Sequence, residues 1–187
     1  FGIILQGGTH GAVMRALARL GAADYAGNSD VPLLILNVIH PLSPEQILGF
    51  MEDKDAVLVI EEGHPAFIED QIRSFAHGAG ATCRVFGKGM VPTTGEYVPS
   101  AVRAGIATFL EAASPKVVAS KATAENATIR ANADAAKAEL KVELPARPPG
   151  FCSGCPERPV FTALKMIERE RGPVHVSMDI GCSTFAT

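Results

Sequence analysis

The sequence has little cysteine, no marked excess of charge of either sign and no long uninterrupted apolar run. Four cysteines in 187 residues do not make a disulfide scaffold, so a reducing cytoplasm is the expected location. The formal net charge of −3 argues against broad electrostatic attraction to nucleic acid or to an anionic membrane. The longest apolar run, residues 31–39, is interrupted by Pro32 and Asn37. It predicts a buried strand rather than a membrane span.

The two ends of the sequence favour a segment of a longer protein. The chain opens at Phe1, inside a strand-like run and with no basic region before it. It stops at Thr187, just after a predicted strand and turn. We therefore expect further domains on both sides, and we expect no secretory signal peptide.

Residues 1–111 alternate short apolar runs with amphipathic segments. The alternation predicts strands at residues 1–5, 31–38, 55–60 and 82–86, and helices at 12–20, 45–51, 65–77 and 97–110. Strands and helices that alternate through short links are typical of a parallel sheet with helices on both faces. The predicted fold class is α/β, and residues 1–111 form one domain of it.

The composition changes after residue 111. Residues 112–150 are rich in alanine, lysine and glutamate and poor in large apolar residues, which predicts an exposed helical linker centred on residues 120–140. From residue 151, apolar residues recur at helical spacing at positions 160, 161, 164 and 167, and residues 174–178 read as a strand. Residues 151–187 are too few to bury a core alone. They predict the start of a truncated second α/β domain.

Three of the four cysteines lie in this last segment. Cys152 and Cys155 form a Cys-x-x-Cys motif before a predicted helix start, and Cys182 follows a glycine in a turn after the predicted strand. Thiolates from separate turns are the ligands of iron–sulfur clusters and of structural zinc, although four ligands are usual and only three are present. The Cys-x-x-Cys motif alone is also compatible with half a zinc site or a redox dithiol. Cys83, in a predicted strand, is expected to be a core cysteine.

Two sets of motifs resemble those of the indolepyruvate ferredoxin oxidoreductases, within the 2-oxoacid:ferredoxin oxidoreductase family. The second segment, with RPPGFCSGCPERPVF at residues 147–161 and SMDIGCS at 177–183, is similar to the start of that family's thiamine-diphosphate-binding domain. The first segment resembles the transketolase C-terminal-like domain that precedes it there. Its matching motifs are QGG at 6–8, LNVIHP at 36–41, VIEEG at 59–63 and GEY at 95–97.

The resemblance implies a function and its site residues. Cys152, Cys155 and Cys182 match three ligands of a [4Fe–4S] cluster, and the family's fourth cysteine comes later in the chain. Residues Asp179, Gly181 and Ser183 match the stretch that passes the diphosphate of thiamine, which binds with Mg²⁺. Asp179 is equally compatible with a turn-capping role. The parent enzyme would decarboxylate an aryl pyruvate oxidatively, with coenzyme A and ferredoxin as partners and as a homo- or hetero-oligomer.

Several features of the sequence limit this interpretation. The Gly-Asp-Gly…Asn pattern that holds magnesium and diphosphate is absent, and no catalytic residue can be named. The turn at residues 7–11 fits neither nucleotide-binding spacing, so it predicts a tight strand-to-helix turn. Glu61 and Glu62 could face an interdomain cleft, but solvated or structural carboxylates are favoured. A zinc-stabilised binding module, or a transketolase-like fragment without a redox role, remains open as an alternative.

Overall fold

The fold is described from a computed structural model. It covers residues 1–24, 26–113, 116–140, 142, 150–178 and 181. The chain divides into two compact units, Phe1–Glu139 and Leu140–Thr187, and each is described by itself. No helix in the covered ranges is both long enough and apolar enough to cross a membrane.

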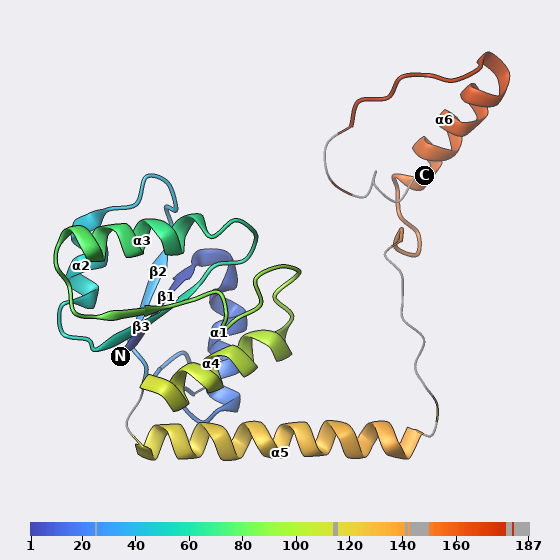
Figure 1. The fold of residues 1–187 in the computed structure, drawn as a ribbon. Helices are drawn as coiled ribbons and strands as arrows, with labels where there is room; N and C mark the ends of the chain where they lie inside the picture. Colours follow the sequence, from blue (N-terminus) through green and yellow to red (C-terminus); the bar gives the residue numbers. More distant parts are fainter. Residues whose placement is uncertain (25, 114–115, 141, 143–149, 179–180, 182–187) are drawn as a thin grey trace. The chain divides into compact units, whose positions relative to one another are not determined.

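The first unit contains a four-stranded sheet and five α-helices among its described residues (Figure 1). Each predicted strand and helix of residues 1–111 is present, with ends that shift by a few residues. In chain order the elements are β1 (Gly2–Gln6), the short 3-10 helix η1 (Gly7–Thr9), α1 (His10–Arg19), β2 (Leu33–Leu36), α2 (Pro44–Met51), β3 (Ala56–Ile60), α3 (Phe67–Gly78), β4 (Arg84–Phe86), α4 (Pro99–Ala113) and α5 (Lys116–Leu140).

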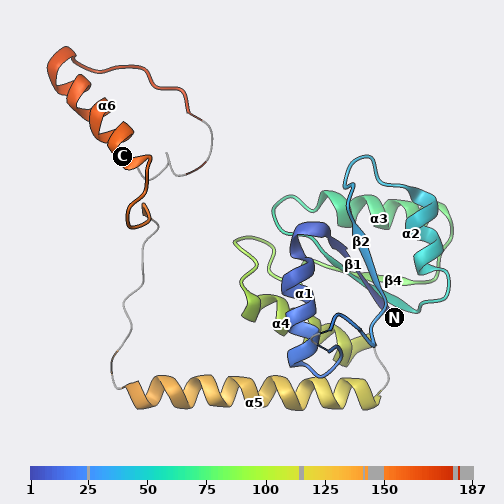
Figure 2. The same cartoon turned by 180° about the vertical axis from the view of Figure 1, so that it is seen from behind.

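The sheet is entirely parallel, in the order β2-β1-β3-β4. Helices α2 and α3 cover one face, and α1 and α4 cover the other (Figures 1 and 2). This confirms the predicted α/β class with helices on both faces. From β1 the chain crosses to β2 on one side, and it then returns past β1 to β3 and β4 on the other side. The loops that leave the carboxyl ends of the neighbouring strands β1 and β3 therefore run in opposite directions. Such a switch point is where open α/β sheets tend to bind ligands.

Burial follows the two-residue period of the strands. Ile3 and Leu5 of β1 pack in the core beneath α1 and α4, whereas Ile4 packs in the core beneath α2 and α3. All five residues of β3 are buried, which explains why this strand reads as a continuous apolar run rather than an alternating one.

Helix α2 begins where the sequence predicts. The hydroxyl of Ser43 accepts a hydrogen bond from the backbone N–H of Gln46 at 3.3 Å, and Pro44 occupies the first helical position. Both features satisfy or remove a backbone donor that the first turn would otherwise leave unpaired.

The start of helix α5 packs on the core of the first unit, to which the helix belongs. Val118 lies against the core beneath α1 and α4, and Ala122 is completely buried in it. The ammonium of Lys121 donates a hydrogen bond of 2.7 Å to the carbonyl oxygen of Gly21. The expectation of an exposed helix over residues 120–140 therefore holds for most of its residues, and it is wrong for Ala122. The apolar stripe of α5 consists of Val118 and Ala122 and buries little apolar area. In a segment rich in alanine, such a narrow stripe cannot be recognised from the sequence.

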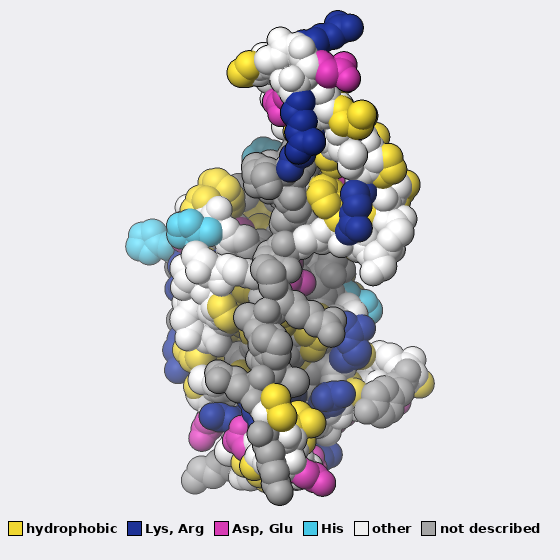
Figure 3. All heavy atoms as spheres, turned by 90° about the vertical axis from the view of Figure 1, so that its right-hand side faces the viewer, with side chains coloured by type: hydrophobic (Ala, Val, Ile, Leu, Met, Phe, Trp, Pro, Cys, Tyr) yellow, Lys and Arg dark blue, Asp and Glu magenta, His cyan; other side chains and the backbone are white. Residues whose placement is uncertain are grey.

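The second unit contains α6 (Arg158–Arg171), as the helical spacing predicts. None of residues 150–178 is buried. On the surface of the second unit, in the upper part of Figure 3, apolar side chains lie between basic ones. Two of its apolar residues are strongly exposed, Val160 at 58% and Met166 at 55%. The predicted strand at 174–178 is wrong, since these residues form no strand. A strand requires a hydrogen-bonded neighbour, and the described part of this unit provides none.

Candidate functional site

The Cys-x-x-Cys motif forms a tight turn that presents two free thiols. The backbone N–H of Cys155 donates to the carbonyl oxygen of Cys152 at 3.1 Å. Gly154 has φ = 72°, in the left-handed region that glycine adopts most readily. Cys152 is exposed and Cys155 is half-buried, and both thiols are free. The turn therefore presents two soft donors at the protein surface.

Arg158, the first residue of α6, fastens this turn to the helix. Its backbone N–H donates to the carbonyl oxygen of Cys155 at 3.3 Å. Its guanidinium donates to the carbonyl oxygens of Phe151 and Cys152 at 3.2 and 3.3 Å. The Phe151 ring stacks on Phe161, with the ring centroids 5.3 Å apart. A guanidinium and the positive end of a helix dipole next to the thiols favour an anionic group there.

The rest of the predicted ligand set cannot be placed. Asp179, Cys182 and Ser183 lie outside the described residues, and Gly181 is exposed. In the ranges that the structure covers, no three residues of His, Cys, Asp or Glu are grouped to hold a metal ion. The two thiols that are placed fit a thiolate-ligated zinc ion or iron–sulfur cluster in their donor chemistry and accessibility. The three-cysteine site therefore stays a prediction.

Cys83 has the environment of a core cysteine. It is 8% exposed and belongs to the core beneath α2 and α3. Burial raises the pKa of its thiol above the ordinary value, because the thiolate would lose solvation. This agrees with the core role predicted for it.

A second candidate site lies at the switch point of the sheet. A cavity of about 700 Å³ is bounded by Gln6 at the end of β1, by residues 61–65 after β3 and by the first turns of α3. The side-chain oxygen of Gln6 accepts a hydrogen bond from the backbone N–H of Glu62 at 3.0 Å. The carboxylate of Glu62 in turn accepts from the backbone N–H of Tyr97 at 2.6 Å. These bonds tie the cavity wall to the loop before α4.

Glu61 has a structural role in this wall. Its side chain is buried, and its two carboxylate oxygens accept the backbone N–H groups of Ile68 and Glu69 at 3.0 and 3.1 Å. Both donors belong to the first turn of α3, where backbone N–H groups have no partner within the helix and where a negative charge is favourable. The structural interpretation of Glu61 is confirmed.

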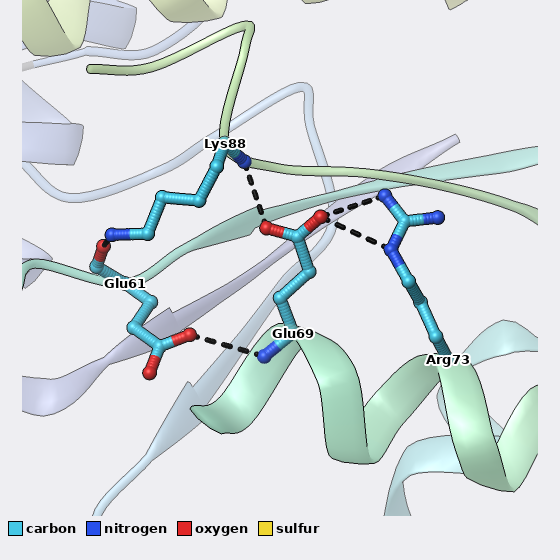
Figure 4. Close-up of polar contacts among 4 residues, drawn as sticks. All are labelled: Glu61, Glu69, Arg73 and Lys88. Carbon is cyan, nitrogen blue, oxygen red and sulfur yellow. Dashed lines mark hydrogen bonds and ion pairs between the residues drawn. The ribbon is translucent and has the colours of Figure 1, made fainter. Parts of the chain in front are cut away.

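Glu69 and Lys88 extend the same network (Figure 4). Glu69 accepts from the guanidinium of Arg73 at 2.7 Å and from the backbone N–H of Lys88 at 2.8 Å. The ammonium of Lys88 donates to the carbonyl oxygens of Glu61 and Gly63. The sequence does not predict this network, because its members meet only once β3, α3 and the loop after β4 are folded together.

Gly7 and Gly8 belong to a tight turn, as predicted, whereas Gly11 lies in the first turn of α1 rather than in the turn before it. Gly7 and Gly8 form η1, and α1 begins at His10. The hydroxyl of Thr9 donates to the carbonyl oxygen of Gln6 at 2.8 Å and closes the turn.

The fold and the candidate site together define a class. The chain is a parallel α/β domain followed by a segment whose exposed thiol pair suits a metal or an iron–sulfur cluster.

Comparison with known proteins identifies similar proteins. The chain is 31% identical over 186 residues to "Indolepyruvate oxidoreductase subunit IorA" of Archaeoglobus fulgidus, and 31% identical over 186 residues to the protein of that name from Thermococcus kodakarensis. It is 29% identical over 190 residues to that of Methanothermobacter marburgensis.

These matches cover 98% of this chain but only 25–26% of each relative. The chain therefore spans about a quarter of the length of the curated relatives. No protein-family model matches it, and no solved structure matches it. The resemblance drawn from the motifs is confirmed: along nearly its whole length the chain is similar to one part of proteins named indolepyruvate oxidoreductase subunit IorA, which are subunits of an enzyme.

Proposed function

We propose that this chain is part of a thiamine-dependent oxidoreductase that decarboxylates an aryl pyruvate oxidatively. The observation that carries the proposal is the match to indolepyruvate oxidoreductase subunits over 98% of the chain. The match includes both units, so it supports the pairing of the α/β domain with the thiol segment rather than either alone. Coenzyme A as acyl acceptor, ferredoxin as electron acceptor and further subunits as partners belong to the same proposal.

In this proposal the second unit supplies three ligands of a [4Fe–4S] cluster, namely Cys152, Cys155 and Cys182. The turn at Cys152 and Cys155 supports this, because its thiols are free and Arg158 places a positive charge near them. A cluster bound there would supply a one-electron route out of the thiamine site. Asp179, Gly181 and Ser183 would line the approach to the diphosphate, whose Mg²⁺ is held by residues outside this chain.

The first unit acts as a scaffold in this proposal. The carboxylates at the switch point are bound to backbone N–H groups, and the ammonium of Lys88 is bound to backbone carbonyls. Groups held in this way fix the loop from Glu61 to Pro65 and contribute rigidity rather than proton transfer. We assign no catalytic acid, base or nucleophile to this chain.

The test is a cysteine series in the full-length parent protein, purified without oxygen. Cys152→Ser and Cys155→Ser should each lower the iron and acid-labile sulfide content and weaken the cluster's electron paramagnetic resonance signal, because each removes a ligand. Cys83→Ser is the matched control, and it should keep the wild-type cluster content because Cys83 lies in the core of the first unit.

Two outcomes would favour the alternatives. A colourless protein with stoichiometric zinc and no sulfide would indicate a zinc-stabilised binding module. A coloured protein in which Cys152→Ser leaves ferredoxin reduction intact would indicate cysteines without a redox role.

A further inference from the structure

Three arginines line one hollow on the face of the first unit that α1 and α4 cover. The hollow has a volume of about 410 Å³ and lies between these two helices. Arg15 and Arg19, one helical turn apart, come from α1, and Arg103 comes from the first half of α4. Pro99 and Ser100, at the start of α4, complete its rim together with Ala16. We call this hollow the arginine cavity.

Arg103 is a buried cation with which no carboxylate in the ranges that the structure covers forms an ion pair. It is only 8% exposed, and its guanidinium donates a hydrogen bond to the side-chain oxygen of Asn126 on α5. Among the described residues, the ion pairs are those of Lys54 with Asp53 and of Arg73 with Glu69, and neither involves the arginine cavity. A buried charge is costly unless an opposite charge and hydrogen bonds compensate it.

The surroundings of Arg103 add positive charge. Burial lowers the pKa of its guanidinium, and the nearby charges of Arg19 on α1 and Arg130 on α5 lower it further. Helix α1 carries no acidic residue, and the acidic residue of α4 is Glu111, two turns after Arg103. Four arginines from three packed helices thus share a small region of a chain whose net charge is −3. This local excess of positive charge favours the binding of an anion.

The backbone at the rim points to the same conclusion. Helix α4 has 15 residues and begins at Pro99, so its amino-terminal end opens at the cavity. The backbone N–H groups of Ala101 and Val102 donate to the carbonyl oxygen of Val98, and Pro99 has no N–H. The helix end therefore favours an anionic ligand mainly through its partial positive charge. The hydroxyl of Ser100, exposed on the same rim, is a further donor.

We propose that the arginine cavity binds the phosphoryl group of a small phosphate ester or of free phosphate. A phosphoryl dianion has three terminal oxygens and can accept charge-assisted hydrogen bonds from several guanidinium groups at once, whereas a carboxylate has two oxygens and one charge. Arg103 is held in place by Asn126, so its donors are oriented before the ligand arrives. The proposal does not depend on the proposed enzyme activity, because the cavity lies wholly within the first unit.

The test is calorimetric titration of the full chain with inorganic phosphate, coenzyme A and dephospho-coenzyme A. The two coenzymes differ only in the 3′-phosphate monoester. Stronger binding of coenzyme A than of dephospho-coenzyme A identifies an ester as the source of the phosphoryl group, and equal affinity for inorganic phosphate and coenzyme A identifies the phosphoryl group alone. We expect Arg103→Gln to weaken binding about tenfold or more.

Because Arg103→Gln alters a buried position, it could weaken binding by disturbing the fold. A second variant separates this effect from the loss of a ligand contact. The double variant Arg15→Gln/Arg19→Gln changes side chains that reach solvent and should also weaken binding about tenfold or more, with an unchanged far-ultraviolet spectrum. The control is Arg84→Gln, an exposed arginine on strand β4 outside the cavity, which should bind as the wild type does.

Three results would overturn the proposal. The first is that no probe binds at millimolar concentration. The second is that binding occurs but survives both cavity variants. The third is that the variants abolish binding of an acidic protein such as a ferredoxin while no phosphate probe binds, which would make the cavity part of a protein interface instead.

Discussion

The two units of this chain differ in what holds their residues in place. In the first unit a four-stranded sheet lies between two layers of helices, and all five residues of β3 are buried. In the second, none of residues 150–178 is buried and α6 leaves large apolar side chains in solvent. The apolar surface of α6 needs a cover that the described part of this unit does not supply. The first unit can stabilise itself, whereas the second depends on further structure.

The same contrast holds for the reactive groups. The buried carboxylates of the first unit, Glu61 and Glu69, are bound to backbone N–H groups and to Arg73. The thiols of Cys152 and Cys155 in the second unit are free and lie on a turn held by few contacts. Functional segments are commonly drawn from the less stable parts of a structure, and the position of the thiols fits that pattern.

The largest expected effect compares a phenylalanine in each unit. Phe109 on α4 is completely buried and its ring packs on Phe1 and Phe86, with centroid separations of 6.5 and 5.7 Å. Phe109→Ala should lower the free energy of unfolding of the first unit by about 3–5 kcal/mol. Phe161→Ala should change the same transition by less than about 0.5 kcal/mol. Urea denaturation of the full chain, followed by circular dichroism, measures both.

Equal losses in these two variants would break the comparison. They would mean that the two units unfold as one cooperative structure and that α6 is not independent of the sheet.

The next effect tests whether Glu61 is structural. Glu61→Gln leaves one oxygen to accept from the backbone N–H groups of Ile68 and Glu69, and it removes the negative charge next to the start of α3. We expect a loss of about 2–3 kcal/mol in the free energy of unfolding. The control Glu52→Gln, at an exposed position, should stay within about 0.5 kcal/mol of the wild type. A stable Glu61→Gln variant would contradict the structural role.

The sequence predicts the elements that depend on local signals and misses the contacts that depend on tertiary packing. In the first unit the apolar periodicity, the Ser43 cap and the glycine turns are local signals, and they predict every strand and helix of residues 1–111. The contacts of Glu61 with α3, and the meeting of Arg103 with α1, depend on tertiary packing and leave no local signal beyond the pair Arg15 and Arg19. In the second unit the strand at 174–178 was predicted from composition, but a strand forms only where a neighbour pairs with it.

A smaller effect should appear only at alkaline pH. Burial, and then the charges of Glu61, Glu62 and Glu69, raise the pKa of Tyr97 to about 12 from its ordinary value of 10.0. The folded chain therefore holds the phenolic proton at pH values where the unfolded chain loses it. The stability from this group is fully present below pH 10 and is lost as the pH rises towards 12.

Tyr97→Phe is the variant that isolates this effect. It removes the hydrogen bond of 2.8 Å to the carbonyl oxygen of Pro92 and should cost about 1 kcal/mol at neutral pH. It should also flatten the fall in stability between pH 10 and 12, as measured by urea denaturation at each pH. An unchanged slope would show that other groups govern the alkaline transition.

The smallest effect on global stability is expected from the turn that carries the thiols. Gly154 has φ = 72°, where an alanine is disfavoured by about 1–2 kcal/mol and asparagine is better tolerated. If the proposed metal or cluster is bound at this turn, Gly154→Ala should therefore make the full-length protein release it to a chelator at least about fivefold more readily, and Gly154→Asn should do so less. Neither should move the unfolding midpoint of the first unit, because no residue of this turn is buried. A shifted midpoint would show that the thiol segment contributes to the stability of the sheet, and the division between a self-sufficient first unit and a dependent thiol segment would then fail.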